Sequence, residues 1–238
     1  RQMCIRDRRI TGRQEDGNIA CCGACDIMGT ANTFQCMAEV LGLTIPGTAN
    51  VPGFHTDKLI SARQAGKRIV DMVAEGLTAR KILTEKSIEN AVIMDLVIGG
   101  STNSTLHLPA IAHELGLELP LKKFNDLNKK IPTLLSIDPN GDHSIIDLYA
   151  AGGIPAVMKV MADDLHLDAL CVTGQSFYEI TSRASVLDET VIRPKDRPYL
   201  AEGGTVILYG NIAPDGAVVK QSAVNSDMLV FTGPARVM

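Results

Sequence analysis

The sequence contains no tryptophan, and aromatic residues make up only 4% of its 238 positions. Proteins that bind single-stranded nucleic acid without sequence preference stack the bases on aromatic rings, so this composition argues against that class. Basic residues are not in excess either, because 23 Lys and Arg residues stand against 27 Asp and Glu residues and give a formal net charge of -4. No basic block stands out, and we therefore expect no nucleic-acid partner.

Long apolar runs and a secretory cysteine pattern are also absent. A membrane-spanning helix needs about 20 consecutive apolar residues, and the sequence has no comparable run, so we expect no membrane span. The six cysteines are too few and too clustered for the disulfide framework of a secreted protein. The first residues have no signal-peptide pattern. A reducing cytoplasm is therefore the expected location.

What the sequence does contain is a large apolar fraction, 45%, arranged in helical patterns and short apolar runs. Apolar residues at helical spacing predict helices over 30–41, 58–75, 106–115, 120–131 and 177–184. The second of these helices is expected to bury one stripe of side chains: Leu59, Ala62, Ala65, Ile69 and Met72. Residues 168–173 have the composition of a short buried strand, whereas periodicity leaves open whether 93–98 is strand or helix. This alternation predicts an α/β layered domain.

The composition changes near residue 192, where prolines flank charged residues as in a linker. Residues 9–192 form the expected α/β domain, incomplete at its N-terminus. Residues 193–238 are expected to be the start of a truncated β-rich domain, with strands over 204–209, 217–219 and 228–231. Residues 1–8, Cys4 among them, look like a translated sequencing adaptor and carry no functional argument. Both ends are abrupt, so we expect a fragment of a longer protein.

Four cysteines lie within sixteen positions around the start of the first predicted helix: Cys21, Cys22, Cys25 and Cys36. A helix N-terminus supplies positive potential that favours a thiolate, and thiolates bind metals and iron–sulfur clusters. Cys25 is therefore the candidate metal ligand. Two other interpretations stay open, namely a buried free thiol at Cys25 and a C-x-x-C redox pair with Cys22. A closed zinc site would need further ligands, and Cys36 on the helix is poorly placed to be one.

A glycine-rich loop over 99–103 precedes a predicted helix. Glycine lets the backbone approach a ligand closely, and hydroxyl and N–H groups at a helix start can hold an anion. Ser101, Thr102 and Asn103 are therefore candidate substrate-binding residues. The alternative is a tight turn in which Ser101 or Thr102 caps the helix. The loop lacks the lysine of a P-loop, and His107 further along fits a packed histidine better than a base.

Several strings in colinear order carry a family resemblance: CGAC and TAN within 22–32, GGSTN at 99–103, GGIPAVM at 152–158, YGNIAPDGAVVK at 209–220 and TGPARV at 232–237. Taken alone, the Pro-Asp-Gly segment is an ordinary β-turn and Lys220 an ordinary surface cation. Together, the strings resemble the dihydroxy-acid dehydratase and sugar-acid dehydratase family, an iron–sulfur group. The resemblance extends over residues 18–238.

The resemblance implies a hydro-lyase that removes water from a 2,3-dihydroxy carboxylic acid and yields a 2-keto acid. In the family three cysteines hold an iron–sulfur cluster, of either the 4Fe-4S or the 2Fe-2S type, and Cys25 matches one of them. Cys21 and Asp26 depart from the commoner pattern. The cluster iron acts as a Lewis acid on the leaving hydroxyl, and a Mg²⁺ ion binds the substrate. The remaining cluster cysteines and the magnesium lysine fall upstream of Cys25 in the family, and the serine base falls beyond Met238.

The catalytic residues are therefore unknown within this chain, and we expect the chain alone to be inactive. For the parent we expect a dihydroxy acid of branched-chain amino-acid biosynthesis as substrate. The alternatives are a sugar-acid substrate of the same family or, from another class, a C-x-x-C redox or metal-binding protein without lyase activity. A homodimer of the full-length protein is implied by the resemblance alone.

Overall fold

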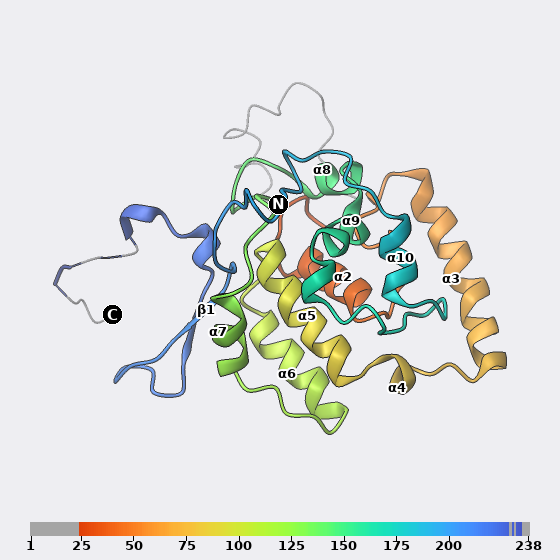
Figure 1. The fold of residues 1–238 in the computed structure, drawn as a ribbon, viewed down its shortest axis with the longest axis horizontal. Coiled ribbons are helices and arrows are strands. Elements are labelled where there is room, and N and C mark those ends of the chain that lie inside the picture. Colours follow the sequence, from red (N-terminus) through yellow and green to blue (C-terminus); the bar gives the residue numbers. More distant parts are fainter. Residues whose placement is uncertain (1–23, 229, 231, 235–238) are drawn as a thin grey trace.

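Helix α5 (Glu85–Ile98) lies at the centre of the structure, a computed structural model that describes residues 24–228, 230 and 232–234 (Figure 1). Thr84 caps this helix, because its hydroxyl accepts from Ser87 N (3.3 Å) while the Ser87 hydroxyl accepts from Thr84 N (2.7 Å). Beyond its first turn the helix is mostly apolar on all sides, and every residue from position 90 to its end is buried. Residues 93–98, for which periodicity leaves strand or helix open, are the last turns of this helix.

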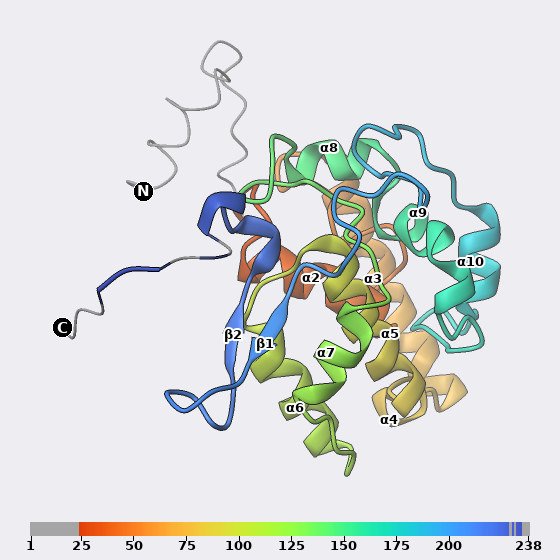
Figure 2. The same cartoon turned by 60° about the vertical axis from the view of Figure 1, so that its left-hand side comes forward.

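Two groups of helices surround α5 (Figures 1 and 2). The helices that pack directly against it are α2 (Thr30–Val40), α6 (Ser104–Glu114) and α7 (Lys122–Asn128). The second group contacts α2 through α9 and consists of α8 (Ile145–Ala150), α9 (Gly153–Val160) and α10 (Phe177–Arg183). Shorter elements are α4 (Ala79–Ile82), η1 (Ala162–Asp164), η2 (Gln221–Ala223) and η3 (Ser226–Met228). The helices predicted over 30–41, 106–115, 120–131 and 177–184 are thereby confirmed, with small differences at their ends.

The described residues contain one sheet, an antiparallel pair of β1 (Val206–Leu208) and β2 (Ala217–Val219). It packs beside α7, where the Asn125 side chain accepts from Ile207 N (2.8 Å) and donates to Ile207 O (2.7 Å). The strands predicted over 204–209 and 217–219 are confirmed. The predicted α/β class is therefore confirmed. The described chain is mostly helical, and its sheet is confined to the C-terminal part.

The strand predicted over 168–173 is wrong. Leu170 makes only an isolated bridge with Ser176, and the chain between them turns back on itself. Within that turn, Gly174 N donates to Cys171 O (2.8 Å) and Cys171 N donates to Gln175 O (3.0 Å). Ala169 and Cys171 are buried in this turn, whose backbone groups bond within it or, at Val172, to Gly42 O and the Arg68 side chain, so no neighbouring strand is needed. Of residues 228–231, Met228 ends η3 rather than starting a strand, and positions 229 and 231 lie outside the described residues, as do residues 1–8, Cys21 and Cys22.

Helix α3 (Thr56–Glu75) confirms the helix predicted over 58–75 but not its buried stripe. It lies at the edge of the molecule (Figure 1), and Met72 is its only buried residue, whereas Leu59 is 76% exposed and Ile69 56%. Polar contacts attach it instead: Tyr149 Oη donates to Asp57 Oδ2 (2.7 Å), and Arg68 Nε donates to Val172 O (2.5 Å). Periodicity shows which face of a helix is apolar but not whether another element covers that face.

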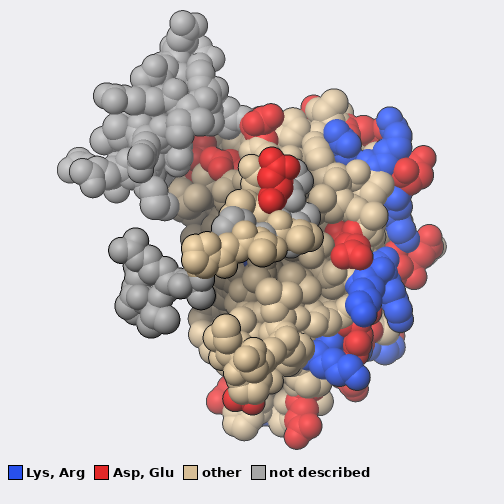
Figure 3. Space-filling model, turned by 90° about the vertical axis from the view of Figure 1, so that its left-hand side faces the viewer, with Lys and Arg blue, Asp and Glu red and all other residues tan. Residues whose placement is uncertain are grey.

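The face that carries β1 and β2 is largely uncharged, with Lys and Arg side chains gathered along one side of it (Figure 3). Exposed apolar side chains of this face include Leu208, Tyr209 and Ile212. Among the helices of the described residues, none combines the length and the apolar character that crossing a membrane requires.

Gly42, directly after α2, allows a test of the packing between α2 and the turn over 170–176. Its φ is +79°, and an added Cβ would lie 2.4 Å from Leu170 O. We expect Gly42→Ala to lower the free energy of unfolding by roughly 2 kcal/mol or more, because strain and overlap act together. The control is Gly66→Ala, since Gly66 is inside α3 and an added Cβ there meets nothing within 4 Å. Gly66→Ala should stabilise the protein by roughly 0.5–1 kcal/mol in urea unfolding, and equal effects of the two changes would contradict this packing.

Candidate active site

The cysteine loop, residues 24–29, leads into α2 and carries Cys25, a partly exposed free thiol. Asn32, in the first turn of α2, shapes the loop: its Nδ2 donates to the carbonyl oxygen of Cys25 and to that of Ile27 (2.7 Å). The side-chain amide therefore turns the backbone carbonyls toward the helix and fixes the path of the chain around Cys25. This contact gives the TAN string a structural role in shaping the cysteine loop.

Two backbone hydrogen bonds attach the cysteine loop to the chain that runs toward α8. Met28 N donates to Asp138 O (2.6 Å), and Ile145 N donates to Asp26 O (2.9 Å). The loop is thus held at two of its inner residues, Asp26 and Met28, by segments more than a hundred residues away in sequence. Cys25 directly precedes the attachment at Asp26.

The structure brings the 99–103 loop to the start of α2. The Thr30 and Ser101 hydroxyls are 3.0 Å apart, and Asn103 Nδ2 donates to Thr30 Oγ1 (2.7 Å). Ser101 N also donates to Thr33 Oγ1 (3.0 Å). Hydroxyl and amide groups of the two motifs therefore form one hydrogen-bonded cluster at the N-terminal ends of α2 and α6.

Two of the three predicted substrate-binding residues join this cluster, and Thr102 does not. Among the described residues, the hydrogen bonds recorded for Thr102 are those its carbonyl oxygen accepts from Thr105, from N (3.2 Å) and from Oγ1 (2.8 Å). Ser101 is buried, Asn103 is exposed, and neither side chain caps α6. The role in substrate binding stays a prediction for all three residues.

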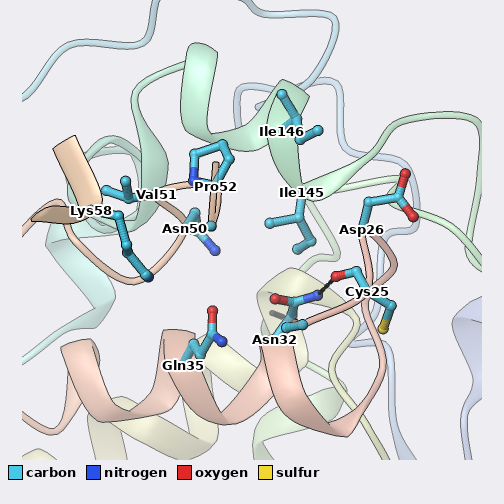
Figure 4. A pocket seen from close by; sticks show the side chains of 12 residues that line it. Cys25, Asp26, Asn32, Gln35, Asn50, Val51, Pro52, Lys58, Ile145 and Ile146 are labelled. Atoms are coloured by element: carbon cyan, nitrogen blue, oxygen red, sulfur yellow. Dashed lines mark hydrogen bonds between the residues drawn. The ribbon is translucent and has the colours of Figure 1, made fainter. Parts of the chain in front are cut away.

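A cavity of about 110 Å³ lies beside Cys25, between the cysteine loop, α2 and the segment over 50–53 (Figure 4). Gln35 and Asn50 point their amides into it, whereas the Cys25 sulfur and the Asp26 carboxylate point away. Ile145 and Ile146 add an apolar wall, and Lys58 of α3 adds a cation to the lining. The cavity thus combines amide donors and acceptors with one positive charge, a set that suits a small anionic ligand.

Asn50 reaches the cavity because Glu39 of α2 holds the loop before it. Glu39 Oε1 accepts from Gly47 N (2.6 Å), and Oε2 accepts from Ala49 N (2.9 Å). Glu39 is buried, and burial raises its pKa to about 7 while these N–H groups lower it. Asn50 Nδ2 in turn donates to Cys36 Sγ (3.3 Å).

Cys25 differs from the other two cysteines that the structure describes. Cys36 and Cys171 are fully buried, and burial raises the pKa of Cys36 to about 12. A thiol with so high a pKa stays protonated, so Cys36 acts as a small apolar core residue. The expectation that Cys36 is poorly placed as a metal ligand agrees with its position on the buried face of α2.

The described residues do not make a complete metal centre. No group of three or more His, Cys, Asp or Glu side chains that could hold an ion exists among them. A thiolate at Cys25 fits one ligand position of an iron–sulfur cluster, which needs several such donors. Cys22, the possible redox partner of Cys25, lies outside the described residues.

Sequence reasoning missed two ionisable residues near these motifs, the buried Asp95 and the partly buried Lys220. Asp95 in α5 is fully buried, and burial raises its pKa to about 7. Lys220, treated above as a surface cation, donates from Nζ to Met28 O in the cysteine loop (3.0 Å), and burial lowers its pKa. The signal for Asp95 was available, because it is the one charged residue in the apolar run over 91–98. No local signal marks Lys220, whose contact spans 192 positions.

Comparison with known proteins defines the class to which these motifs belong. Residues 6–180 match the family model described as dihydroxy-acid/6-phosphogluconate dehydratase N-terminal, and residues 190–238 match the corresponding C-terminal model. The chain therefore belongs to the dihydroxy-acid/6-phosphogluconate dehydratase family. This confirms the resemblance that the sequence strings indicate.

Similar curated proteins carry the name dihydroxy-acid dehydratase. The protein of Methanococcoides burtonii is 51% identical over 226 residues, which cover 92% of this chain and 41% of that protein. The protein of Ignicoccus hospitalis is 50% identical over 217 residues, or 90% of this chain and 39% of that protein. The protein of Acetivibrio thermocellus is 49% identical over 218 residues, with 91% and 39% covered. The chain thus spans about two-fifths of the length of the curated relatives it matches.

The burial of the cysteines predicts a clear order of alkylation. Iodoacetamide should modify Cys25 more than about tenfold faster than Cys36 or Cys171, because only Cys25 of these three is reached without opening the core. Peptide mass spectrometry separates the three sites from the cysteines at positions 4, 21 and 22. Equal rates at Cys25 and Cys36 would contradict the described packing.

The raised pKa of Glu39 predicts how stability changes with pH. Between the ordinary value of 4.5 and about 7, the unfolded chain releases a proton that the folded chain keeps, so the free energy of unfolding falls as pH rises. Glu39→Gln should lack this contribution, which amounts to roughly 3 kcal/mol at most. Urea unfolding at pH 5 and pH 8 measures the difference. Glu114→Gln, at an exposed position, is the control and should keep the wild-type pH dependence.

Proposed function

We propose that this chain is part of a hydro-lyase that removes water from a 2,3-dihydroxy carboxylic acid and releases a 2-keto acid. The observation that carries the proposal is the hydrogen-bonded cluster of Thr30, Ser101 and Asn103, which joins the two family motifs beside Cys25. The family match and the names of the relatives support the same activity. The part of the site in this chain would bind and orient the substrate.

The proposed roles follow from the chemistry of the side chains. Cys25 is one ligand of an iron–sulfur cluster, which when bound supplies a Lewis-acidic iron. The cavity lined by Gln35, Asn50 and Lys58 offers amides and a positive charge to the carboxylate of a dihydroxy acid. The leaving hydroxyl is not assigned to this cavity, because the Cys25 sulfur points away from it (Figure 4). Mg²⁺ remains a proposed second cofactor, and the described residues contain no group of three or more His, Cys, Asp or Glu side chains that would mark its site.

The substrate class that we favour is a branched-chain dihydroxy acid, because the relatives at about half identity bear the dihydroxy-acid dehydratase name. A sugar acid is the alternative within the family, whose model description names 6-phosphogluconate as well. The cytoplasmic location and the homodimer stay predictions.

A chimera tests the proposal. In it, this chain replaces the matching part of the Methanococcoides burtonii protein, and the dehydration of 2,3-dihydroxyisovalerate is measured after cluster reconstitution. We expect turnover in the chimera and none in the chain alone. Cys25→Ser should lower the rate more than about a hundredfold and lower the bound iron, since even partners that only support metal ligands contribute 10–100-fold. Cys171→Ala is the control and should keep iron and activity.

The same samples decide between this proposal and a C-x-x-C redox protein. A cluster enzyme contains iron and acid-labile sulfide, whereas a disulfide protein contains neither. An iron-free chimera whose cysteines cycle between thiol and disulfide would overturn the dehydratase proposal.

A further inference from the structure

We propose that Lys220 and Asp95 form a charge pair that positions the cysteine loop. In this arrangement the Asp95 carboxylate attracts the Lys220 ammonium through space, without a direct hydrogen bond, and Lys220 donates to the carbonyl of Met28. Lys220 is thus a positioning residue for Cys25, and it acts from the C-terminal part of the chain. The role of Cys25 as a cluster ligand rests on the proposed function, whereas the contacts described next are independent of it.

The segment that carries Lys220 is fixed to the end of α5 by contacts of its own. Ser222 Oγ donates to Asn140 Oδ1 (3.1 Å), and Asn140 Nδ2 donates to Gly99 O (2.9 Å). The fit is close, because a Cβ added to Gly99 would lie 3.1 Å from Ser222 Oγ. Since Lys220 precedes Ser222 by two positions, its backbone lies beside the same helix end where Asp95 is buried.

The far end of the Lys220 side chain reaches the cysteine loop. Its Nζ donates to Met28 O (3.0 Å), while Met28 N donates to Asp138 O (2.6 Å). The Met28 backbone is therefore held on both of its polar sides, and the Met28 side chain is fully buried. Releasing the Lys220 contact would leave this carbonyl without the ammonium that it faces.

Asp95 offers a buried negative charge that acts on the Lys220 ammonium at a distance, since no hydrogen bond or ion pair joins the two side chains. Its Oδ1 accepts from Ser104 Oγ (2.5 Å), whereas its Oδ2 is buried and has no hydrogen-bond partner among the described residues. A Cβ added to Gly100 would lie 2.0 Å from Asp95 Oδ1, so the carboxylate fills the space beneath the 99–103 loop and has little freedom. A buried carboxylate with an unsatisfied oxygen is costly unless an opposite charge compensates it.

Lys220 supplies that charge. Burial raises the pKa of Asp95, and the Ser104 hydrogen bond and the positive charge of Lys220 lower it. Burial lowers the pKa of Lys220, and the negative charges of Asp95 and Asp138 raise it. Asp138 is the second acid that faces the ammonium, but Asp95 is the one with a buried oxygen that lacks a hydrogen bond.

The rate of Cys25 alkylation in the full chain tests the proposal, since it needs neither cluster nor substrate. We expect Lys220→Met and Asp95→Asn each to raise this rate roughly tenfold, which corresponds to about 1.4 kcal/mol of lost attachment. The double variant should be no faster than the faster single variant, because both changes break one interaction. Lys220→Arg keeps the charge and should restore most of the protection. Lys195→Met, which removes a surface lysine paired with Asp164, is the control and should not change the rate.

The buried thiols Cys36 and Cys171 separate positioning from general loosening. A rise at Cys25 alone supports the proposal. If Lys220→Met unfolds the chain, Asp95→Asn decides, because it removes the charge but keeps the shape and an acceptor for Ser104. An unchanged Cys25 rate in Asp95→Asn, or a rise that Cys36 and Cys171 share equally, would overturn the charge pair. The measurement does not depend on turnover. A result that overturns the charge pair can therefore be told apart from a result that overturns the proposed dehydratase activity.

Discussion

The close approach of the 99–103 loop to the first turns of α2 is the contact on which the candidate site depends. Gly100 lies between Asp95 and Thr33, and an added Cβ would lie 2.0 Å from Asp95 Oδ1 and 3.1 Å from Thr33 Cγ2. Only a residue without a side chain lets the two segments come together. That approach allows Ser101 to bond with Thr30 and Thr33, and so aligns the N-terminal ends of two helices. Partial positive charge from both ends then lies on one side of the molecule, where anionic ligands are favoured.

Much of the helical fold was predictable from the sequence, because helix ends have local causes. Thr84 with Ser87 and Ser176 with Glu179 form reciprocal caps that are separated by three positions. The position of each helix in the molecule has no such local cause. The apolar stripe of α3 looks like a core stripe, yet it lies at the edge of the described chain. The apolar run over 168–173 likewise fits a strand by composition, although its backbone bonds are made within a turn and, at Val172, with Gly42 and Arg68 rather than with a neighbouring strand.

The candidate site likewise contains residues that the sequence predicts and residues that it does not. Cys25, Ser101 and Asn103 belong to short strings with a recognisable composition, and the structure brings these strings together. Thr102 shares the string but not the contacts, since alternate residues of a tight loop point in different directions. Asp95 could have been noticed as a charge in an apolar run, but its neighbours could not. Lys220 was beyond reach, because only the folded chain places it next to Met28.

The long span of that contact has a consequence for the order of events during synthesis. Lys220 follows Met28 by 192 positions, and at about 5–20 residues per second a ribosome needs on the order of ten to forty seconds to cover them. Contacts so distant in sequence are made late, after the local helices have formed. Throughout that interval the loop lacks the contact from Lys220, whereas its partners Asp138 and Ile145 are synthesised earlier. The loop around the thiol at position 25 is thus fastened in two stages, and the second waits for the later part of the chain.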